Sequence, residues 1–392
     1  MRLPRFAVLS LLLCIPAHAG RDEGDARLTL DIPLKEENPV QPLPETIVPL
    51  KRQVRVLRPE EDATYKRELV VVRARAWLTT GSVDTRISYQ IPPQDITLLA
   101  GSQKTPFSLG ETEQRQDNGL MLVYSAEVAP IRWLSGEFQY GDDSHKGSYG
   151  DHYWVDGPGW SQFQNFATGG IWNYPSHQDD LVLGSDASSH RDWAAGNIYA
   201  RVLELRNRRP NDPVWHETLD IALGYERFRQ NSSLTNLSVT MNAGKWYSPG
   251  LPVGPIAGFD SSYNADWTGP HFGIRDEVAL PYGFSFDGLF LWSPFMVYRG
   301  KGYDNLGTYW EPVTSSSPNL IDTAHGTAVH FQLGARWAWG MFGIEAGYQR
   351  FYFYSRTGTR TFLAPDGSTS SMQLDFATAE VAGAYGGVTW RY

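Results

Sequence analysis

Apolar and polar residues alternate one by one in a series of segments that starts near residue 68 and continues to the C-terminus. From Val72 to Leu78 every second residue is apolar, with two arginines in between, and the stretch from Val329 to Trp337 repeats the pattern. Successive side chains of a β-strand point to opposite faces, so this period predicts strands with one apolar and one polar face. About ten such segments occur, which predicts an all-β fold.

The connections between these segments alternate between short and long. We expect short turns at Pro130, over 207–213, at Tyr282-Gly283 and over 339–341. Five long polar connections lie between them, at about 80–119, 142–196, 230–263, 300–326 and 356–373. Short periplasmic turns and long extracellular loops are typical of outer-membrane proteins. A secreted β-sandwich or β-propeller fits the composition but does not explain this regular alternation.

The pattern therefore predicts a transmembrane, antiparallel, up-and-down β-barrel of about ten strands. Twelve strands are the alternative, because the loops at 80–119 and 142–196 are long enough to hide another hairpin. Charged residues occupy the polar face of the strands and should point into the barrel: Arg73, Arg75, Glu127, Asp220, Glu226, Arg275, Glu277 and Arg336. Opposite charges on neighbouring strands can pair there and fill a narrow lumen, which counts against an open channel.

The first nineteen residues have the pattern of a cleaved signal peptide. Arg2 and Arg5 precede an apolar stretch over 6–15, and small residues follow within 16–19. The apolar stretch is too short to span a bilayer as a helix. Cys14, the one cysteine, raises the alternative of a lipoprotein, although Leu13 stands where a small residue would be expected before an acylated cysteine. We expect export to the outer membrane of a Gram-negative-type bacterium.

The segment 20–67 is rich in proline and in charged residues, and we interpret it as a periplasmic arm, with a small plug as the alternative. The barrel is then 68–392. The formal charge of −9 becomes −11 once Arg2 and Arg5 leave, and an acidic surface argues against a nucleic-acid partner. Mean hydropathy is −0.37 and no later run reaches the roughly 18 apolar residues of a membrane helix. Yet there are 14 Trp, 20 Tyr and 38 Gly, as expected where only alternate residues face lipid.

The C-terminus has a pattern of its own. Tyr385, Gly387, Trp390 and Tyr392 resemble the terminal-strand signal that the barrel-assembly machinery recognises, so this machinery is an expected partner. Outer-membrane lipid and lipopolysaccharide are further expected partners. Aromatic residues expected at the membrane interfaces are Trp292, Trp337, Trp339, Tyr348, Trp390 and Tyr392.

The stretch from about Asn264 to Tyr352 resembles the omptin barrels. The residues 266–275 enter a strand, and the turn at Tyr282-Gly283 leads into a strand from Phe284. The resemblance covers the barrel from Glu68 onward and implies ten strands that rise well above the bilayer. It also implies a rim site in which an Asp-x-Asp pair faces an Asp-x-His pair and a water is held between carboxylate and imidazole.

This chain departs from the rim pattern that the resemblance implies. Asp151 matches the first acid, but Tyr153 occupies the place of the second. Gly302 replaces the other acid and Asp304 stands where the histidine should be. A carboxylate is a poor replacement for a general base among other acids, because like charges raise each other's pKa. The departure argues against omptin-type proteolysis.

The remaining catalytic candidates are therefore Asp151, Asp304 and His325, the last of which begins the next strand. The alternative is that these loop residues are merely solvated. No His-x-His or His-Glu-x-x-His spacing predicts a metal, and we expect no cofactor. No Gly-x-Ser-x-Gly motif occurs, and Ser188-Ser189-His190 does not have the pattern of a nucleophile elbow.

The second long loop holds the densest group of aromatic residues, and the candidate ligand-binding residues lie there: Trp154, Trp160, Trp172 and Tyr174. Aromatic faces stack on sugars or anchor a protein partner, whereas the alternative is that the loop packs its own rings. We predict a non-proteolytic outer-membrane barrel with a structural role or a role in binding a surface protein or glycan. An endopeptidase with a rearranged rim site, and a small pore or export channel, are the alternatives.

Overall fold

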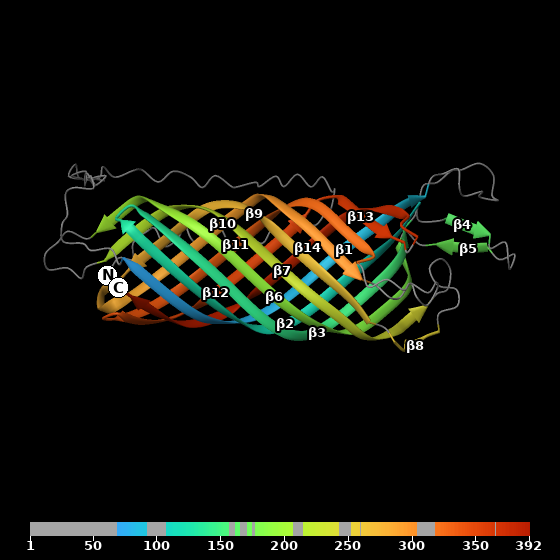
Figure 1. The fold of residues 1–392 in the computed structure, drawn as a ribbon, viewed down its shortest axis with the longest axis horizontal. Coiled ribbons are helices and arrows are strands. Elements are labelled where there is room, and N and C mark those ends of the chain that lie inside the picture. The colour runs from blue at the N-terminus through green and yellow to red at the C-terminus, as the bar shows by residue number, and fades with distance from the viewer. Residues whose placement is uncertain are drawn as a thin grey trace, which may run out of the picture. The chain divides into compact units, whose positions relative to one another are not determined.

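Strands make up nearly all of the part of the chain that the computed structural model describes (Figure 1). None of the described residues forms a helix long and apolar enough to cross a membrane. The predicted signal peptide and the predicted arm lie outside the described residues. The described ranges are 69–91, 107–156, 161–164, 171–174, 177–206, 215–242, 252–258, 260–303, 318–364 and 366–392.

Ten strands follow one another around a closed ring: β1 (Val70–Ile91), β2 (Phe107–Ile131), β3 (Leu134–Asp156), β6 (His177–Arg206), β7 (His216–Asn242), β9 (Asp260–Ala279), β10 (Phe284–Tyr303), β11 (Leu320–Trp339), β12 (Phe342–Ser355) and β14 (Thr369–Arg391). Short strands β8 (Gly254–Pro255) and β13 (Gly358–Leu363) join the same sheet and bring it to twelve. A separate hairpin pairs β4 (Ser161–Gln164) with β5 (Ile171–Tyr174).

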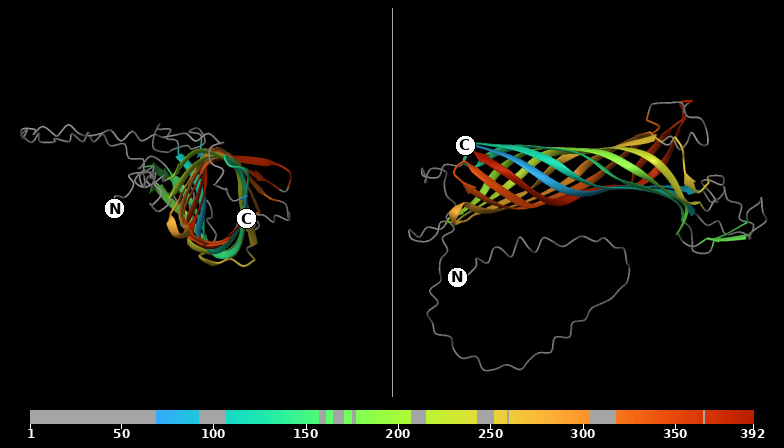
Figure 2. Two further views of the ribbon diagram at one scale, coloured as in Figure 1. Left: turned by 90° about the vertical axis from the view of Figure 1, so that its left-hand side faces the viewer. Right: turned by 90° about the horizontal axis from the view of Figure 1, so that it is seen from below.

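The ring closes where the last strand pairs with the first. β14 runs antiparallel to β1, with Trp390 opposite Val72 and Tyr385 opposite Trp77. The end-on view of Figure 2 shows the resulting closed cross-section. The predicted antiparallel up-and-down barrel is confirmed, with about ten strands in the ring and twelve in the whole sheet. Closure leaves no free sheet edge, which is the condition for strands to cross a bilayer.

Outward side chains near the short turns form an apolar belt. Leu78, Leu120, Phe138, Ile198 and Leu223 are all exposed on the outer wall, and the polar residues between them face inward. A membrane strand needs only about 9–11 residues. The belt is therefore the segment that crosses the bilayer, and it ends at about Leu78 on β1, Leu120 on β2 and Tyr140 on β3.

The strands continue far beyond this belt, and this corrects the predicted loop boundaries. β6 has 30 residues, about three times the length that a bilayer needs. Much of each predicted long loop is strand; the connection expected at 80–119, for example, contains the end of β1 and the start of β2. The prediction was wrong because outward residues above the membrane are polar, so the apolar alternation stops although the pairing continues.

One side chain on β10 departs from simple alternation. An unbroken period of two would place Met296 on the outer face with Trp292, but it is fully buried inside the barrel. A register shift between Ser293 and Met296 moves the later residues to the opposite face. An irregularity of one residue exchanges inside and outside because the side-chain period is two.

The membrane-crossing half of the barrel is filled with paired charges. Arg73 bonds Glu137 at 2.8 Å and Glu127 at 3.2 Å, and Arg275 reaches Glu127 at 2.9 Å and Asp220 at 2.8 Å. All eight residues predicted to point inward do so. Burial of Glu127, Asp220 and Glu277 is tolerable because each has an arginine partner, whereas Glu226 accepts a hydrogen bond from the Ser293 hydroxyl at 2.8 Å.

A layer of aromatic rings closes the lumen above these charges. Phe351 packs against Trp77 (5.1 Å between ring centroids) and Trp193 (4.7 Å), and its neighbour Phe353 packs against Phe228 (5.0 Å) and Trp267 (5.8 Å). These rings come from β1, β6, β7, β9 and β12, so they meet across the barrel. All six rings are fully buried. The lumen is a packed core at this level.

Candidate functional site

Asp151 lies on the inner face of β3, well above the membrane belt. Its side chain is 3 % exposed, and Oδ1 has no hydrogen-bond partner among the described residues. Burial raises the pKa of the Asp151 carboxyl well above its ordinary value, and the negative charges of Glu111 and Glu113 raise it further. Burial and the neighbouring acids therefore both favour the neutral form of Asp151 over the carboxylate.

Beside Asp151, an arginine joins two strands across the barrel. Arg360 of β13 contacts Glu113 at 2.9 Å and Asp322 of β11 at 2.8 Å. Burial alone would raise the pKa of Glu113, but Arg360 and Arg115 outweigh it and lower the pKa to about 2. The environment thus shifts the pKa values of these two acids in opposite directions, down for Glu113 and up for Asp151.

A small cavity of about 30 Å³ lies between these groups. Asp151, Arg115, Tyr263 and Tyr303 line it together with three leucines of β6 and β7: Leu183, Leu234 and Leu237. Arg115 is buried, and its Nε and Nη1 have no hydrogen-bond partner among the described residues. The cavity has room for one or two waters that would satisfy these atoms. It is too small for a peptide.

The structure does not bring His325 to this cavity. His325 is exposed on the outer face of β11, whereas its neighbour Ala324 points inward. Asp151 and His325 therefore lie on opposite sides of the barrel wall. Asp304 falls outside the described residues. None of the described residues that line the cavity is a histidine.

Three of the four candidate ligand-binding aromatics lie on described strands, at the end of β3 and in β5. Trp160 falls outside the described residues, and for Trp154, Trp172 and Tyr174 only the strand positions are described. In the hairpin, Trp172 of β5 is opposite Phe163 of β4, and Tyr174 is opposite Ser161. Directly opposed residues share one side of a hairpin, so three aromatic positions lie on one side.

A buried cluster below the rim was missed by the sequence analysis. Arg191 contacts Asp143 at 2.7 Å and Asp117 at 3.1 Å, and it donates a hydrogen bond to Thr79 at 2.6 Å. His145 lies 3.0 Å from Asp143 and 2.7 Å from Asp117. Asp143 and His145 are two residues apart, and this period-two spacing was the available signal. It was not used because the stretch was expected to be loop.

This cluster serves mainly to hold the barrel together. Arg191 comes from β6, Asp143 and His145 from β3, and Asp117 from β2, and all four side chains are almost completely buried. Buried charges cost free energy unless each has a partner, and here they form a closed set. The cluster therefore joins three strands and has no open side for a substrate.

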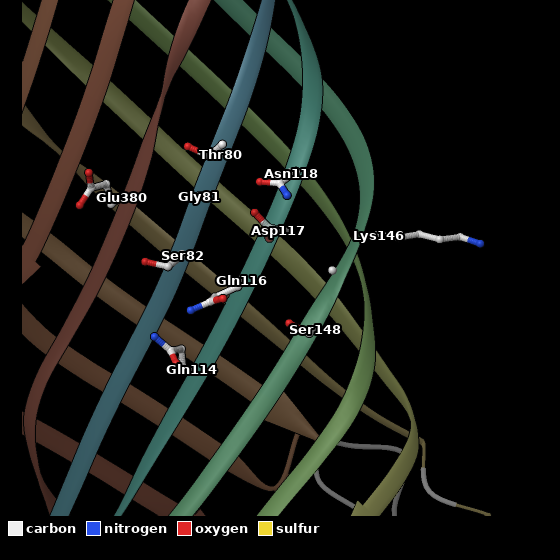
Figure 3. A pocket seen from close by; sticks show the side chains of 11 residues that line it. Thr80, Gly81, Ser82, Gln114, Gln116, Asp117, Asn118, Lys146, Ser148 and Glu380 are labelled. Carbon is white, nitrogen blue, oxygen red and sulfur yellow. The ribbon is translucent and has the colours of Figure 1, made fainter.

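A groove with a volume of about 500 Å³ lies on the outer wall of β1, β2 and β3 (Figure 3). Amide and hydroxyl groups line most of it: Gln114, Gln116, Asn118, Thr80, Ser82 and Ser148. Lys146 and Glu380 also border the groove; Glu380 already has a partner in Arg350, at 2.9 Å. The groove starts directly above Leu78 and Leu120, at the edge of the belt.

Known structures share this architecture. The crystal structure of the outer membrane protease OmpT from Escherichia coli superposes with a TM-score of 0.56 over 82 % of this chain and 96 % of that chain, at 11 % identity. The chain folds as an outer-membrane β-barrel. A Pseudomonas aeruginosa FadL homologue also matches, covering 82 % of this chain and 90 % of that chain at 9 % identity, but its TM-score of 0.27 carries no argument.

Sequence comparison adds nothing to this fold assignment. No family model matches the chain, and no curated protein matches it. At 11 % identity the likeness to OmpT shows a common fold and not a common activity. The function of this barrel has to be argued from its own residues.

Proposed function

We propose that the protein is a non-proteolytic surface barrel that binds glycan through the β4–β5 hairpin. The observation that carries the proposal is the hairpin register, which gathers Phe163, Trp172 and Tyr174 on one side. Ser161, opposite Tyr174, adds a hydroxyl position on the same side. Aromatic faces beside a hydroxyl are well suited to sugars, because rings stack on the C–H face and the hydroxyl bonds to sugar hydroxyls.

The tall barrel supports this role. Its strands extend well beyond the belt, and β4 and β5 follow in the chain from the end of β3 that lies away from the belt (Figure 1). A filled lumen supports a binding role over a pore. Two cavities lie on opposite sides of the aromatic layer. One is the 30 Å³ cavity near the rim; the other, of about 180 Å³, lies near the short turns and is lined by Arg73 and Arg275 among others. Electrical silence in planar bilayers is the expected result.

Glycan-array binding by the refolded protein tests the proposal. Trp172→Ala should reduce binding at least about 10-fold. The guide is the stacking of a nucleic-acid base on an aromatic side chain, which is worth about 1–3 kcal/mol. Ile171→Ala, at a position on the other side of the hairpin, is the matched control and should bind normally. Absence of any glycan binding, or equal loss in both variants, would overturn the proposal. Specific capture of a surface protein through Trp172 would replace the glycan by a protein partner.

The endopeptidase alternative keeps one observation in its favour, the buried Asp151 with an unpartnered oxygen beside a cavity. Against it stand the outward position of His325 and the cavity itself, which is too small for a peptide and has no histidine among its described lining residues. Cleavage of dibasic peptides by the refolded protein, abolished in Asp151→Asn, would establish this alternative. Unchanged peptide would exclude it.

Membrane partners follow from the belt and from the last strand. We expect lipid and lipopolysaccharide to surround the apolar belt, and the barrel-assembly machinery to read β14. Trp390 and Tyr392 face outward, whereas Tyr385 is buried and bonds Gln332 at 3.3 Å. Tyr385 and the closely packed Gly387 are accessible only before the barrel closes, so we place recognition of this strand before closure.

A further inference from the structure

Three side chains on the outer wall form a serine, histidine and aspartate arrangement. Ser144 and Asp142 lie on β3, and His190 lies directly opposite Ser144 on β6. The Oγ of Ser144 is 3.2 Å from Nδ1 of His190, and the Nε2 of His190 is 3.2 Å from Oδ1 of Asp142. Asp142 and Ser144 are two residues apart, so both point to the outer face.

This arrangement can activate the serine. With its proton on Nε2, the imidazole can accept the Ser144 hydroxyl proton at Nδ1. The 3.2 Å approach of Nε2 to Asp142 is an ion-pair contact, and Oδ1 makes no hydrogen bond among the described residues, so a small rotation of the exposed ring is needed to bring that N–H onto the carboxylate. The ring is used in the reverse sense from the common hydrolase triad. His190 and Asp142 are both about half exposed, so a substrate can reach the serine.

The position on the barrel identifies the substrate class. Tyr140 precedes the cluster on β3, and Leu120 and Leu122 lie beside it on β2, all exposed on the apolar belt. The cluster thus lies where the hydrocarbon of the bilayer meets the headgroups. Ester bonds of glycerolipids lie at this boundary, with acyl chains on one side and polar headgroup on the other.

The polar groove of Figure 3 adjoins the cluster on its headgroup side. Lys146 borders the groove and is two residues from Ser144 on the same face, and Asn118 of β2 is opposite Lys146. Main-chain pairing between β2 and β3 stops at Asn118–Lys146 and resumes at Leu122–Asp142. The two strands are therefore not paired beside Ser144. The Lys146 ammonium and main-chain N–H groups of this stretch are the available donors for an oxyanion.

We propose that Ser144, His190 and Asp142 form an esterase site that hydrolyses acyl esters of outer-leaflet glycerolipids. The acyl chain lies against the apolar belt, and amides and hydroxyls of the groove hold a hydroxyl-rich headgroup. This activity does not depend on glycan binding by the hairpin, which lies in a different part of the chain.

The reaction proceeds in two balanced halves. Ser144 Oγ attacks the ester carbonyl while its proton passes to His190 Nδ1; the ester C–O bond breaks, and the leaving alcohol takes that proton. Water then attacks the acyl-serine and gives a proton to His190, which returns it to Ser144 Oγ as the fatty acid leaves. Asp142 is a positioning residue that holds the imidazole and stabilises its positive charge.

Hydrolysis of a diacylphosphatidylglycerol and of a 4-nitrophenyl acyl ester in mixed micelles tests the proposal with the full refolded barrel. Wild type should turn over, and a fluorophosphonate probe should label Ser144, as located by mass spectrometry of the peptides. Ser144→Ala should abolish labelling and lower kcat at least about 100-fold, and His190→Gln should have a similar effect.

Two further variants separate catalysis from folding. Ser233→Ala removes an exposed serine of β7, a strand that contributes no residue to the cluster or the groove, and it should keep the wild-type rate. Asp142→Asn should lower kcat with little change in KM and slow the labelling, whereas Asp142→Glu should recover part of both. Folding of every variant is checked by heat-modifiable gel mobility.

Several results would overturn the esterase. These are a folded wild type with neither turnover nor label, a rate unaffected by Ser144→Ala, or a label on another serine. Equal kcat in Asp142→Asn and wild type would remove Asp142 from the site.

Discussion

Arg191→Met is expected to be among the most destabilising single substitutions in the barrel. The Arg191 guanidinium is completely buried and contacts Asp143 at 2.7 Å and Asp117 at 3.1 Å. Methionine keeps most of the volume but leaves two buried carboxylates without their main cation. Breaking a buried ion pair by removing one partner costs about 3–5 kcal/mol, because the remaining charge is uncompensated.

The matched control is Arg350→Met. Arg350 contacts Glu380 at 2.9 Å, a similar distance, but its side chain is 43 % exposed on the outer wall. An exposed ion pair contributes about 0–1 kcal/mol, because water solvates both charges once the pair is broken. The two substitutions remove the same group, so their difference isolates the effect of burial.

Urea-induced unfolding of both variants in lipid vesicles, followed by tryptophan fluorescence, measures the difference. Neutralising both acids of the cluster together with Arg191→Met, as Asp143→Asn and Asp117→Asn, should recover part of the loss, since no buried charge is then left unpaired. The reasoning is refuted if Arg191→Met lies within about 1 kcal/mol of Arg350→Met.

Three other outcomes follow from the structure. Glu113, with its pKa lowered to about 2, stabilises the fold above its unfolded value of 4.5, and this contribution should fade as pH falls from there towards 2 in an acid-unfolding series. The pKa of Asp151 is raised in the folded state, so this residue lowers the stability of the fold as pH rises above 3.8. Asp151→Asn should therefore stabilise the barrel at pH 7 and leave its stability unchanged at pH 3. A destabilised variant at pH 7 would contradict this. Gly283→Ala should lower the stability by about 1–3 kcal/mol, and by more than Gly340→Ala in the same unfolding assay. Both glycines have positive φ (80° and 60°), but only a Cβ at position 283 would collide with a main-chain oxygen, that of Ala338.

The membrane half of the fold was predictable because two simple constraints act on it. Lipid demands an apolar outer face and complete backbone pairing, and the strand period translates this into alternation along the chain. The pairing of the last strand with the segment Val72 to Leu78 followed in the same way, since an up-and-down barrel must join its first and last strands.

The upper half was not predictable by that signal. Above Leu78, Leu120 and Tyr140 both faces of the wall carry polar residues, so nothing in hydropathy separates paired strand from loop. The bulge before Met296 was missed for a related reason, because one extra residue changes no composition but exchanges the faces.

The candidate sites show the same division. The omptin-like comparison led to Asp151, which the structure places in a buried cavity, but it could not show that His325 points to the other side of the wall. Ser144, His190 and Asp142 formed no motif, because His190 is 46 residues from Ser144 and meets it only through strand register.

By itself, the sequence determined the class of fold, which charged side chains of the membrane half face the lumen, and which strand closes the barrel. Each of these depends on a period of two along a single strand. Tertiary structure alone decided how far the barrel rises above the membrane, which charges share a buried cluster and which polar side chains meet across strands. Those features depend on the register between strands distant in sequence, and a single residue of register moves every side chain to the other face.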